Sequence, residues 1–424
     1  MLSLVEHYQF MLLLYVKEYH TPINATMVYE MRLLMLNRLE TAFITTEEQQ
    51  QLHNKLASLG QKLFELANKS DAEQSFSYES IKLLKSIQYH TLTVPKKYGG
   101  LGGGLYELVL FQEQLAQYDP AIALAFGWHL STILDINEKK MWKLEHIVEL
   151  NRLVVEQAYL VNRAATEPTS GSPTRGAMPT TTVEIDQEKN VVINGQKSYT
   201  SLSPALDLIL VSASYNGQKA EVVVPANAKG VSFTNDWDMV GMRGTASYLL
   251  TLNNVKLLGE AIKSISSAKQ PESANAALLH IPACYLGIAL AARQEAISFA
   301  RQYQPPSLQQ PIIYTPNVQQ HLGEMELALQ TARSFMYYTA ERYEAALDKA
   351  SVSSSLATVK ISAMRAALDC VDRAMKIVGL KGLAMSHPLQ RLYRDVRFGL
   401  HNPPMEDAVL FSLAKKAIDD LRET

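Results

Sequence analysis

The spacing of hydrophobic residues divides the chain into three stretches. From Thr45 to about Asn162, apolar residues recur every three or four positions, which is the period of an amphipathic helix. The clearest run is Leu52, Leu56, Leu59, Leu63 and Leu66. This stretch is predicted to be all helical, and the first strands are expected only after Met178.

From Met178 to Leu258 the period changes to two. The segments "TTTVEIDQEKNVVINGQKSYTS" and "LDLILVSASYNGQKAEVVVPA" alternate apolar and polar residues, as half-exposed strands do. Asn194-Gly195 and Asn216-Gly217 are dipeptides favoured in two-residue hairpin turns. The pattern predicts a small antiparallel sheet or barrel.

After Ser273 the helical period returns. Segments near 274–303, 316–349, 352–380 and 404–422 carry broad apolar faces rich in Ala, Leu and Met, which is typical of a helix bundle. The predicted fold class is therefore α+β and multidomain. It comprises an N-terminal all-α domain at 41–162, a middle antiparallel β-barrel-like domain at 163–265 and a C-terminal four-helix bundle at 266–424.

Residues 1–40 are expected to form an amphipathic extension. Its apolar run, Phe10 to Val16, is far shorter than the roughly 20 residues that span a bilayer. No basic start followed by a small-residue cleavage site is present in it, so no signal peptide is expected.

Composition narrows the classes of function. The 424 residues include 40 basic and 42 acidic side chains, a balance that does not predict a nucleic-acid partner. The two cysteines lie far apart in helical context, so neither a disulfide framework nor a metal site is predicted. A cytoplasmic location is expected.

A glycine cluster at Gly99–Gly104 allows two interpretations. It could cradle a phosphate, or it could be a tight connection between helices. No Lys-Ser/Thr pair follows it, and it does not lie between a strand and a helix, so the connection is favoured.

The segment "AATEPTSGSP" at 164–173 reads as a turn, in which Pro168 ends a helix. Together with four other segments, however, it resembles the acyl-CoA dehydrogenase superfamily of flavoproteins. In chain order, the five segments are "VPKKYGGLGG" (94–103), "TEPTSGSP" (166–173), "INGQKSYTS" (193–201), "WDMVGMRGTASYLLTLNNV" (237–255) and "RLYRDVR" (391–397). The resemblance extends from about residue 45 to the end.

This resemblance implies a flavin, FAD, and assigns its contacts. Amide donors at the reducible edge and an aromatic wall suit a flavin. The implied cofactor contacts are Ala164, Ala165, Thr166, Ser172, Tyr199, Thr200, Ser201 and Lys376, the last toward a phosphate. Ser172, Arg243 and His129 are the implied substrate contacts; Arg243 could equally fasten a domain interface, and His129 could be structural.

The preferred activity is oxidation of an acyl-CoA or similar thioester between its α and β carbons, with electrons passing to an electron-transferring flavoprotein. That chemistry needs a carboxylate base at the α-proton. The resemblance puts Pro403 at one family base position and Ala277 near the other. Glu406, three residues beyond Pro403, is the expected base, or else an acid that favours a helix start.

Two alternatives stay open. "GLHNPP" is similar to a segment of dibenzothiophene-monooxygenase-like relatives, in which a flavin reductase supplies reduced flavin; His401 would then handle protons and the cofactor would be FMN. The other alternative is a non-catalytic member, flavin-binding or a scaffold, that kept the fold and lost the chemistry. In each case the resemblance implies a homo-oligomer, a dimer or tetramer, assembled through the bundle.

Overall fold

The computed structural model describes residues 41–169, 178–266 and 276–420. The chain divides into two units, Met1–Phe43 and Ile44–Thr424, and every described helix and strand belongs to the second unit. The predicted extension at 1–40 and the predicted contact Ser172 lie outside the described residues.

The first part of this unit is helical, as expected. A capping box at Thr46, completed by Gln49, starts the first of its helices. The helices are α3 (Glu47–Glu73), α4 (Tyr78–Ser86), α5 (Leu105–Tyr118), α6 (Pro120–Lys139) and α7 (Leu144–Glu156).

The glycine cluster is a connection whose amides already have partners. It joins the 3₁₀ turn η2 (Lys96–Tyr98) to α5. The N–H groups of Leu101, Gly102 and Gly103 donate to the carbonyls of Thr91, Val94 and Leu92 at 3.1, 2.9 and 2.7 Å. The described backbone therefore favours the connection over a phosphate cradle.

The middle part is one mixed sheet. Its described strands are β1 (Val161–Ala164), β2 (Thr182–Ile185), β3 (Val191–Thr200), β4 (Leu208–Tyr215), β5 (Gln218–Pro225), β6 (Val231–Thr234), β7 (Tyr248–Leu257) and β8 (Ile262–Ser266). They run in the order β6-β7-β3-β2-β4-β5-β8, with β1 added beside β4. Both β1 and β2 pair parallel to β4, and the other pairs are antiparallel.

Two local sequence predictions for this sheet were wrong. The stretch ending at Asn162 is not helical throughout: α7 ends at Glu156, and β1 already begins at Val161, held by its parallel ladder with β4. Asn194-Gly195 is not a hairpin turn either, because it lies inside β3 at a bulge opposite β7. Asn216-Gly217 does form the predicted turn between β4 and β5, with φ of 49° and 74°.

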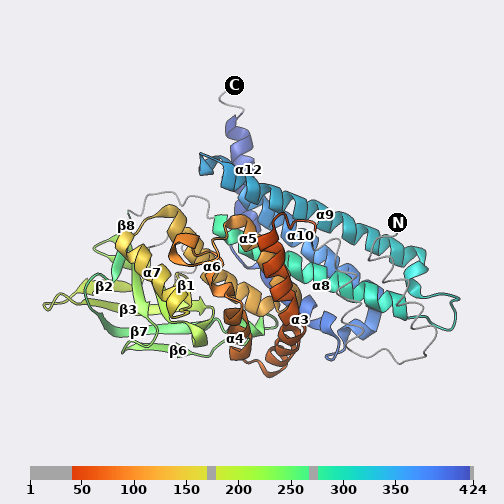
Figure 1. Ribbon diagram of the computed structural model, residues 1–424, viewed down its shortest axis with the longest axis horizontal. Coiled ribbons are helices and arrows are strands. Elements are labelled where there is room, and N and C mark those ends of the chain that lie inside the picture. The colour runs from red at the N-terminus through yellow and green to blue at the C-terminus, as the bar shows by residue number, and fades with distance from the viewer. Residues whose placement is uncertain (1–40, 170–177, 267–275, 421–424) are drawn as a thin grey trace. The chain divides into compact units, whose positions relative to one another are not determined.

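The last part is the predicted bundle. Its elements are α8 (His280–Gln302), α9 (Pro316–Ala345), α10 (Ser353–Val378), α11 (Pro388–Arg397) and α12 (Glu406–Asp420). The long helices α8, α9 and α10 lie side by side, and α5 packs against α8 (Figure 1). Among the described residues, only Ala276–Gln302 is a helical stretch long and apolar enough to cross a membrane, and 83% of its most apolar window is buried within the protein.

A buried ion pair joins the first helical part to the bundle. Arg333 of α9 lies 2.7 Å from Glu113 of α5, and the two side chains are 2% and 3% exposed. The hydroxyl of Tyr337 donates to the same carboxylate at 2.8 Å. These bonds supply the polar partners that buried charges require.

Candidate functional site

The turn that carries Thr166 is fixed by a buried glutamate. The Glu167 carboxylate accepts hydrogen bonds of 2.7 to 3.0 Å from the N–H groups and hydroxyls of Thr180 and Thr181. It also pairs with Lys197 of β3 at 2.7 Å. Burial lowers the pKa of Lys197, while the nearby carboxylate opposes that shift. The turn is therefore held against β3.

Sequence reasoning missed both members of this pair. The sequence held a signal for the pair: Lys197 lies inside a segment that otherwise alternates apolar and polar residues, as a strand does. A lysine that is buried in such a strand needs an anionic partner. Glu167, in the adjacent "TEP" segment, was the acidic residue to match with Lys197.

A bulge in β3 turns Tyr199 outward. Lys197 pairs with Leu250 and Thr200 with Tyr248, so one extra residue lies between these two pairs. Lys197 and Thr200 are both buried, whereas Tyr199 is 61% exposed. Its φ of 58° is a left-handed conformation that side chains other than glycine rarely adopt. Such a conformation at an exposed aromatic residue is typical of a ligand-contacting position.

Three aromatic rings connect the sheet to the C-terminal segment. The Tyr199 and Trp237 rings lie 6.2 Å apart between centroids, and those of Trp237 and Phe398 lie 5.8 Å apart. We call these three residues the aromatic row. Phe398 begins the 3₁₀ turn η10 (Phe398–Leu400), directly after α11. The row therefore brings the "RLYRDVR" segment to the "KSYTS" segment.

His401 follows η10 and is exposed. Its N–H donates to the carbonyl of Phe398 at 3.0 Å, which closes the turn onto the aromatic row. The next residue, Asn402, accepts a hydrogen bond from the hydroxyl of Tyr285, a fully buried residue of α8. The loop that carries His401 is thus anchored in the bundle.

Glu406 has a different environment. It stands in the first turn of α12, and Nε of Arg365 on α10 donates to its Oε1 at 3.0 Å. Pro403, at the expected base position, precedes it, and Ala277 is buried in η6 (Ala276–Leu279). The carboxylate expected as the base is therefore ion-paired at a helix start.

The two segments expected to contact the flavin are joined to each other. The carbonyl of Thr166 accepts from the N–H of Ser198 at 2.9 Å, and that of Ala165 accepts from the Ser212 hydroxyl at 3.5 Å. Ala164, which ends β1, is buried. Nδ2 of Asn162 donates to the carbonyl of Ser201 at 2.9 Å.

Buried polar atoms in this region fit a bound ligand. Oδ1 of Asn162 and Oγ1 of Thr200 are buried and have no hydrogen-bond partner within the described part of the chain. Buried polar groups are nearly always satisfied, so an unmet acceptor or hydroxyl indicates a missing partner. Thr200 is itself a predicted flavin contact and Asn162 lies two residues before Ala164, another one, so a polar, planar ring system such as a flavin suits these atoms.

The residues expected at the substrate have structural contacts. His129 is fully buried: its Nε2 donates to the carbonyl of His90 at 2.8 Å, and its Nδ1 accepts from the N–H of Val161 at 3.0 Å. Burial lowers its pKa to about 4. Arg243 donates to the carbonyls of Met239 and Asp71, at 3.0 and 3.1 Å, and so links the sheet to α3.

Lys376 is exposed in the last turn of α10. A contact between it and a cofactor phosphate stays a prediction, as do substrate contacts of His129 and Arg243.

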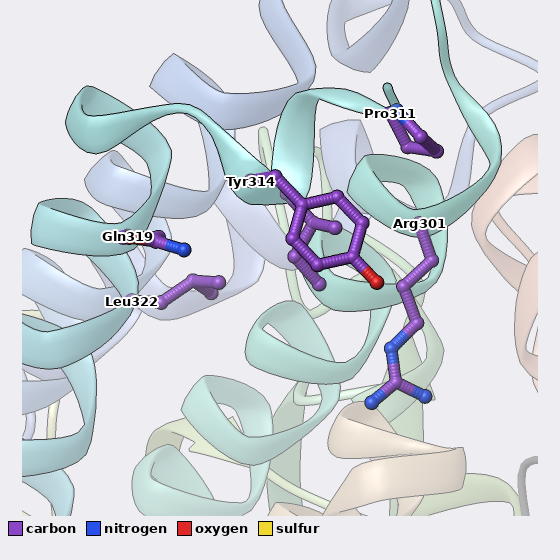
Figure 2. A pocket seen from close by; sticks show the side chains of 6 residues that line it. Arg301, Pro311, Tyr314, Gln319 and Leu322 are labelled. Carbon is purple, nitrogen blue, oxygen red and sulfur yellow. The ribbon is translucent and has the colours of Figure 1, made fainter. Parts of the chain in front are cut away.

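A cavity of about 560 Å³ lies elsewhere, between α8, η7 (Ile312–Tyr314) and α9. Figure 2 shows Tyr314 and Arg301 on one side of it and Gln319 and Leu322 on the other. None of its lining residues belongs to the predicted flavin contacts.

Comparison with known proteins identifies the class. The N-terminal, middle and C-terminal domain models of acyl-CoA dehydrogenase match residues 46–138, 162–255 and 273–399. YdbM of Bacillus subtilis (strain 168), named provisionally as an acyl-CoA dehydrogenase, is 40% identical over 89% of this chain and 99% of its own length. The chain belongs to the acyl-CoA dehydrogenase family. The family is flavin-dependent, in agreement with the expected flavin, FAD or FMN.

Solved structures confirm the fold. Butyryl-CoA dehydrogenase from Megasphaera elsdenii matches with a TM-score of 0.79 at 21% identity and covers 88% of this chain and 99% of its own. TdsC, the dibenzothiophene monooxygenase of Paenibacillus sp. A11-2, was determined with FMN and indole; it matches with a TM-score of 0.77 at 20% identity, covering 88% and 98%. The predicted order of α, β and α parts is that of this family.

Proposed function

We propose that the protein is a flavin-dependent monooxygenase that receives reduced flavin from a separate reductase. One observation carries the proposal. His401 follows directly after the turn that begins with Phe398 of the aromatic row, and Pro403 stands where the family resemblance puts a base. The sequence alone had favoured the dehydrogenase.

Each group in the site has a task in this reaction. Reduced flavin, when bound against Tyr199, supplies electrons to dioxygen. His401 gives or takes a proton at the reacting centre, a task for which histidine is well suited. The aromatic row limits the access of water to the ring. Thr166 and Ser201 lie on segments that β3 holds together, so they present fixed polar groups to the cofactor.

The relatives suggest the substrate. TdsC is a dibenzothiophene monooxygenase, and its structure holds FMN and indole. Another match, MsuC of Pseudomonas fluorescens, is named methanesulfinate monooxygenase. We therefore propose FMN as the cofactor and a small organic compound with an oxidisable sulfur centre as the substrate.

An acyl-CoA dehydrogenase using FAD is the second candidate, and its support is the similarity to YdbM. Glu406 would have to leave Arg365 to serve as its base, and an electron-transferring flavoprotein would accept the electrons. The non-catalytic alternative is less well supported, because a decayed site has no reason to keep unmet polar atoms at Asn162 and Thr200. A cytoplasmic homo-oligomer assembled through the bundle is part of each proposal.

The test compares two variants of one loop. Purified protein is supplied with FMN, a flavin reductase and NADH in air, and organosulfur compounds are screened for oxygenated product. His401→Asn is expected to lower product formation by about 10²-fold, the usual scale for a proton-transfer residue, while reductase activity is unchanged. Glu406→Gln is expected to have little effect.

A loss of acyl-CoA oxidation in Glu406→Gln would instead support the second candidate, the dehydrogenase. This oxidation is measured anaerobically by bleaching of the flavin band at about 450 nm. Bleaching by an acyl-CoA with wild-type protein, together with no oxygenated product, would overturn the monooxygenase proposal.

A further inference from the structure

One lysine of the bundle is buried without an anion. Lys360 of α10 is 3% exposed, yet it forms no hydrogen bond and no ion pair within the described part of the chain. Burying a charged group is costly unless a partner offsets the loss of water. Burial lowers the pKa of Lys360, and the charge of Glu406 opposes that shift. Glu406 forms its own ion pair with Arg365, so Lys360 has no counter-ion in contact with it.

This lysine faces the loop that carries His401. Lys360 lies one helical turn before Met364, so the two side chains leave α10 on the same face. A Cβ on Gly399 would collide with the side chain of Met364 and would lie 3.0 Å from the ring of Tyr285. Gly399 belongs to η10, two residues before His401. The face of α10 that carries Lys360 is therefore the face on which η10 packs.

Two uncharged residues stand where the family resemblance puts a carboxylate. Ala277 lies in η6, which packs against α10, and Pro403 lies in the loop after His401. Neither side chain can supply an anion to Lys360. A partner for this cation therefore has to come from a bound molecule.

We propose that Lys360 binds the anionic group of the substrate beside the His401 loop, and that the substrate is an organic sulfur anion such as a sulfinate. An ammonium group offers a charge-assisted hydrogen bond to an anionic oxygen atom, which is stronger than a bond between neutral groups. The inference rests on the proposed function. It narrows the substrate from small organosulfur compounds to those that carry a negative charge.

The experiment compares two probes of similar size, methanesulfinate and the neutral dimethyl sulfoxide. Binding of each probe to the full-length, FMN-loaded protein is measured by isothermal titration calorimetry at constant ionic strength. Lys360→Met keeps a long side chain and removes its charge. We expect the affinity for methanesulfinate to fall at least about tenfold, the scale of a hydrogen bond to a charged group. The affinity for dimethyl sulfoxide should stay unchanged.

The stability of the ligand-free protein gives a second readout. Replacing an unpaired buried cation with an apolar side chain should raise the midpoint of thermal unfolding. A lysine with a purely structural role would give a lower midpoint instead. Methanesulfinate should raise the midpoint of the wild-type protein, because a ligand stabilises the state that it binds. It should not raise the midpoint of Lys360→Met.

Two variants are controls. Lys360→Arg keeps a positive charge and should keep the preference for methanesulfinate. Lys416→Met removes an exposed lysine of α12 that lies 3.4 Å from the hydroxyl of Ser354, in the first turn of α10. It should change neither the affinities nor the midpoint.

The phosphate of the flavin is another possible anion, and a flavin titration tests it. FMN carries a phosphate and riboflavin does not. Lys360→Met is expected to bind both as the wild-type protein does. A loss of affinity for FMN that riboflavin does not show would overturn the assignment to the substrate.

The other outcomes are also distinct. Equal affinity of the wild-type protein for the two sulfur probes, or unchanged methanesulfinate binding in Lys360→Met, would overturn the inference. Methanesulfinate binding that depends on Lys360 supports it. If that binding is present but no oxygenated product forms when reduced FMN is supplied in air, the anion site holds and the proposed function is contradicted.

Discussion

Nζ of Lys197 lies 2.7 Å from Oε1 of Glu167, and both side chains are almost fully buried, at 0% and 1% exposure. The pair joins the middle of β3 to the turn after β1. Because Thr166 precedes Glu167 and Tyr199 follows Lys197 by two residues, this contact and the bond from the N–H of Ser198 to the carbonyl of Thr166 together set the two predicted flavin-binding segments relative to each other. The ion pair is therefore expected to matter for both stability and cofactor binding.

Replacing the lysine of this pair should be costly. Lys197→Met leaves the Glu167 carboxylate buried without its cation, a change that usually costs about 3–5 kcal/mol. We expect a loss of that size in the free energy of unfolding, measured by urea denaturation, together with weaker flavin binding.

Lys256→Met is the matched control for that variant. Lys256 lies on the neighbouring strand β7 and pairs with Asp186 at 3.2 Å, but its side chain is 60% exposed. Surface pairs contribute about 0–1 kcal/mol, so this change should have little effect. Equal losses in the two variants would show that burial of Lys197 is not what makes its pair important.

The bond between Tyr285 and Asn402 predicts an effect on activity. Tyr285→Phe removes only the hydroxyl that anchors the loop carrying His401. We expect a loss of about 1 kcal/mol in stability and a lower kcat, with flavin affinity unchanged. Tyr337→Phe also removes a buried bundle hydroxyl, the one bonded to Glu113, and should lower stability without lowering kcat. If both variants lower kcat equally, the loop has no special dependence on Tyr285.

The buried His129 predicts acid sensitivity. Burial lowers its folded pKa to about 4, whereas an unfolded histidine titrates at about 6.5. Between these values the unfolded chain binds a proton that the folded chain does not, so stability falls as pH falls from about 6.5 to about 4. His129 accounts for a loss of about 3 kcal/mol in the free energy of unfolding once pH has fallen through this whole range.

His129→Gln should remove that part of the pH dependence. The measurement is the free energy of unfolding at pH 7 and at pH 5, with His387→Asn as the control because asparagine also caps the helix α11 that His387 starts. The same slope in His129→Gln and wild type would contradict the assignment.

The sequence was sufficient for the parts of the fold that have a long periodic signal. The helical runs, the change to period two and the Asn216-Gly217 turn each depend on local chemistry, and each is present. The strand β1 has only four residues, and its pairing partner β4 lies more than forty positions further on, so no local pattern could reveal it. The Asn194-Gly195 bulge has the composition of a turn, and only the ladder with β7 decides against one.

The same limit applies to the site. The segments around Thr166 and Tyr199 could be found as motifs, because their residue types and order are distinctive. The aromatic row could not be found in this way, since it joins three segments whose approach depends on how α11 packs. The partner of Glu406 is likewise a residue of α10, forty-one positions earlier in the chain, and periodicity gives no information about that pairing.

Asp395 predicts a pH dependence of the opposite sign from that of His129. This fully buried carboxylate of α11 accepts a hydrogen bond from the N–H of Met242. Burial raises its pKa to about 6, although the charges of Arg391 and Arg394 and the bond from Met242 lower it; the nearby Asp71 raises it further. An unfolded aspartate titrates at about 3.9. Because the folded carboxyl holds its proton to higher pH, its contribution to stability is present below pH 4 and is lost as pH rises through about 6.

Asp395→Asn imitates the protonated carboxyl at every pH and keeps an oxygen for the N–H of Met242. Relative to wild type, this variant should gain about 3 kcal/mol of stability between pH 4 and pH 7. That is the free energy equivalent to the difference between the folded and unfolded pKa of Asp395. Part of the change will involve Asp119, a buried carboxylate whose pKa is also about 6 and is raised in part by Asp395.

Asp238→Asn, at an exposed position in the loop before η5 (Arg243–Thr245), is the control and should follow the wild-type curve. A constant difference between Asp395→Asn and wild type across this range would mean that Asp395 is already charged at pH 4, held so by Arg391 and Arg394.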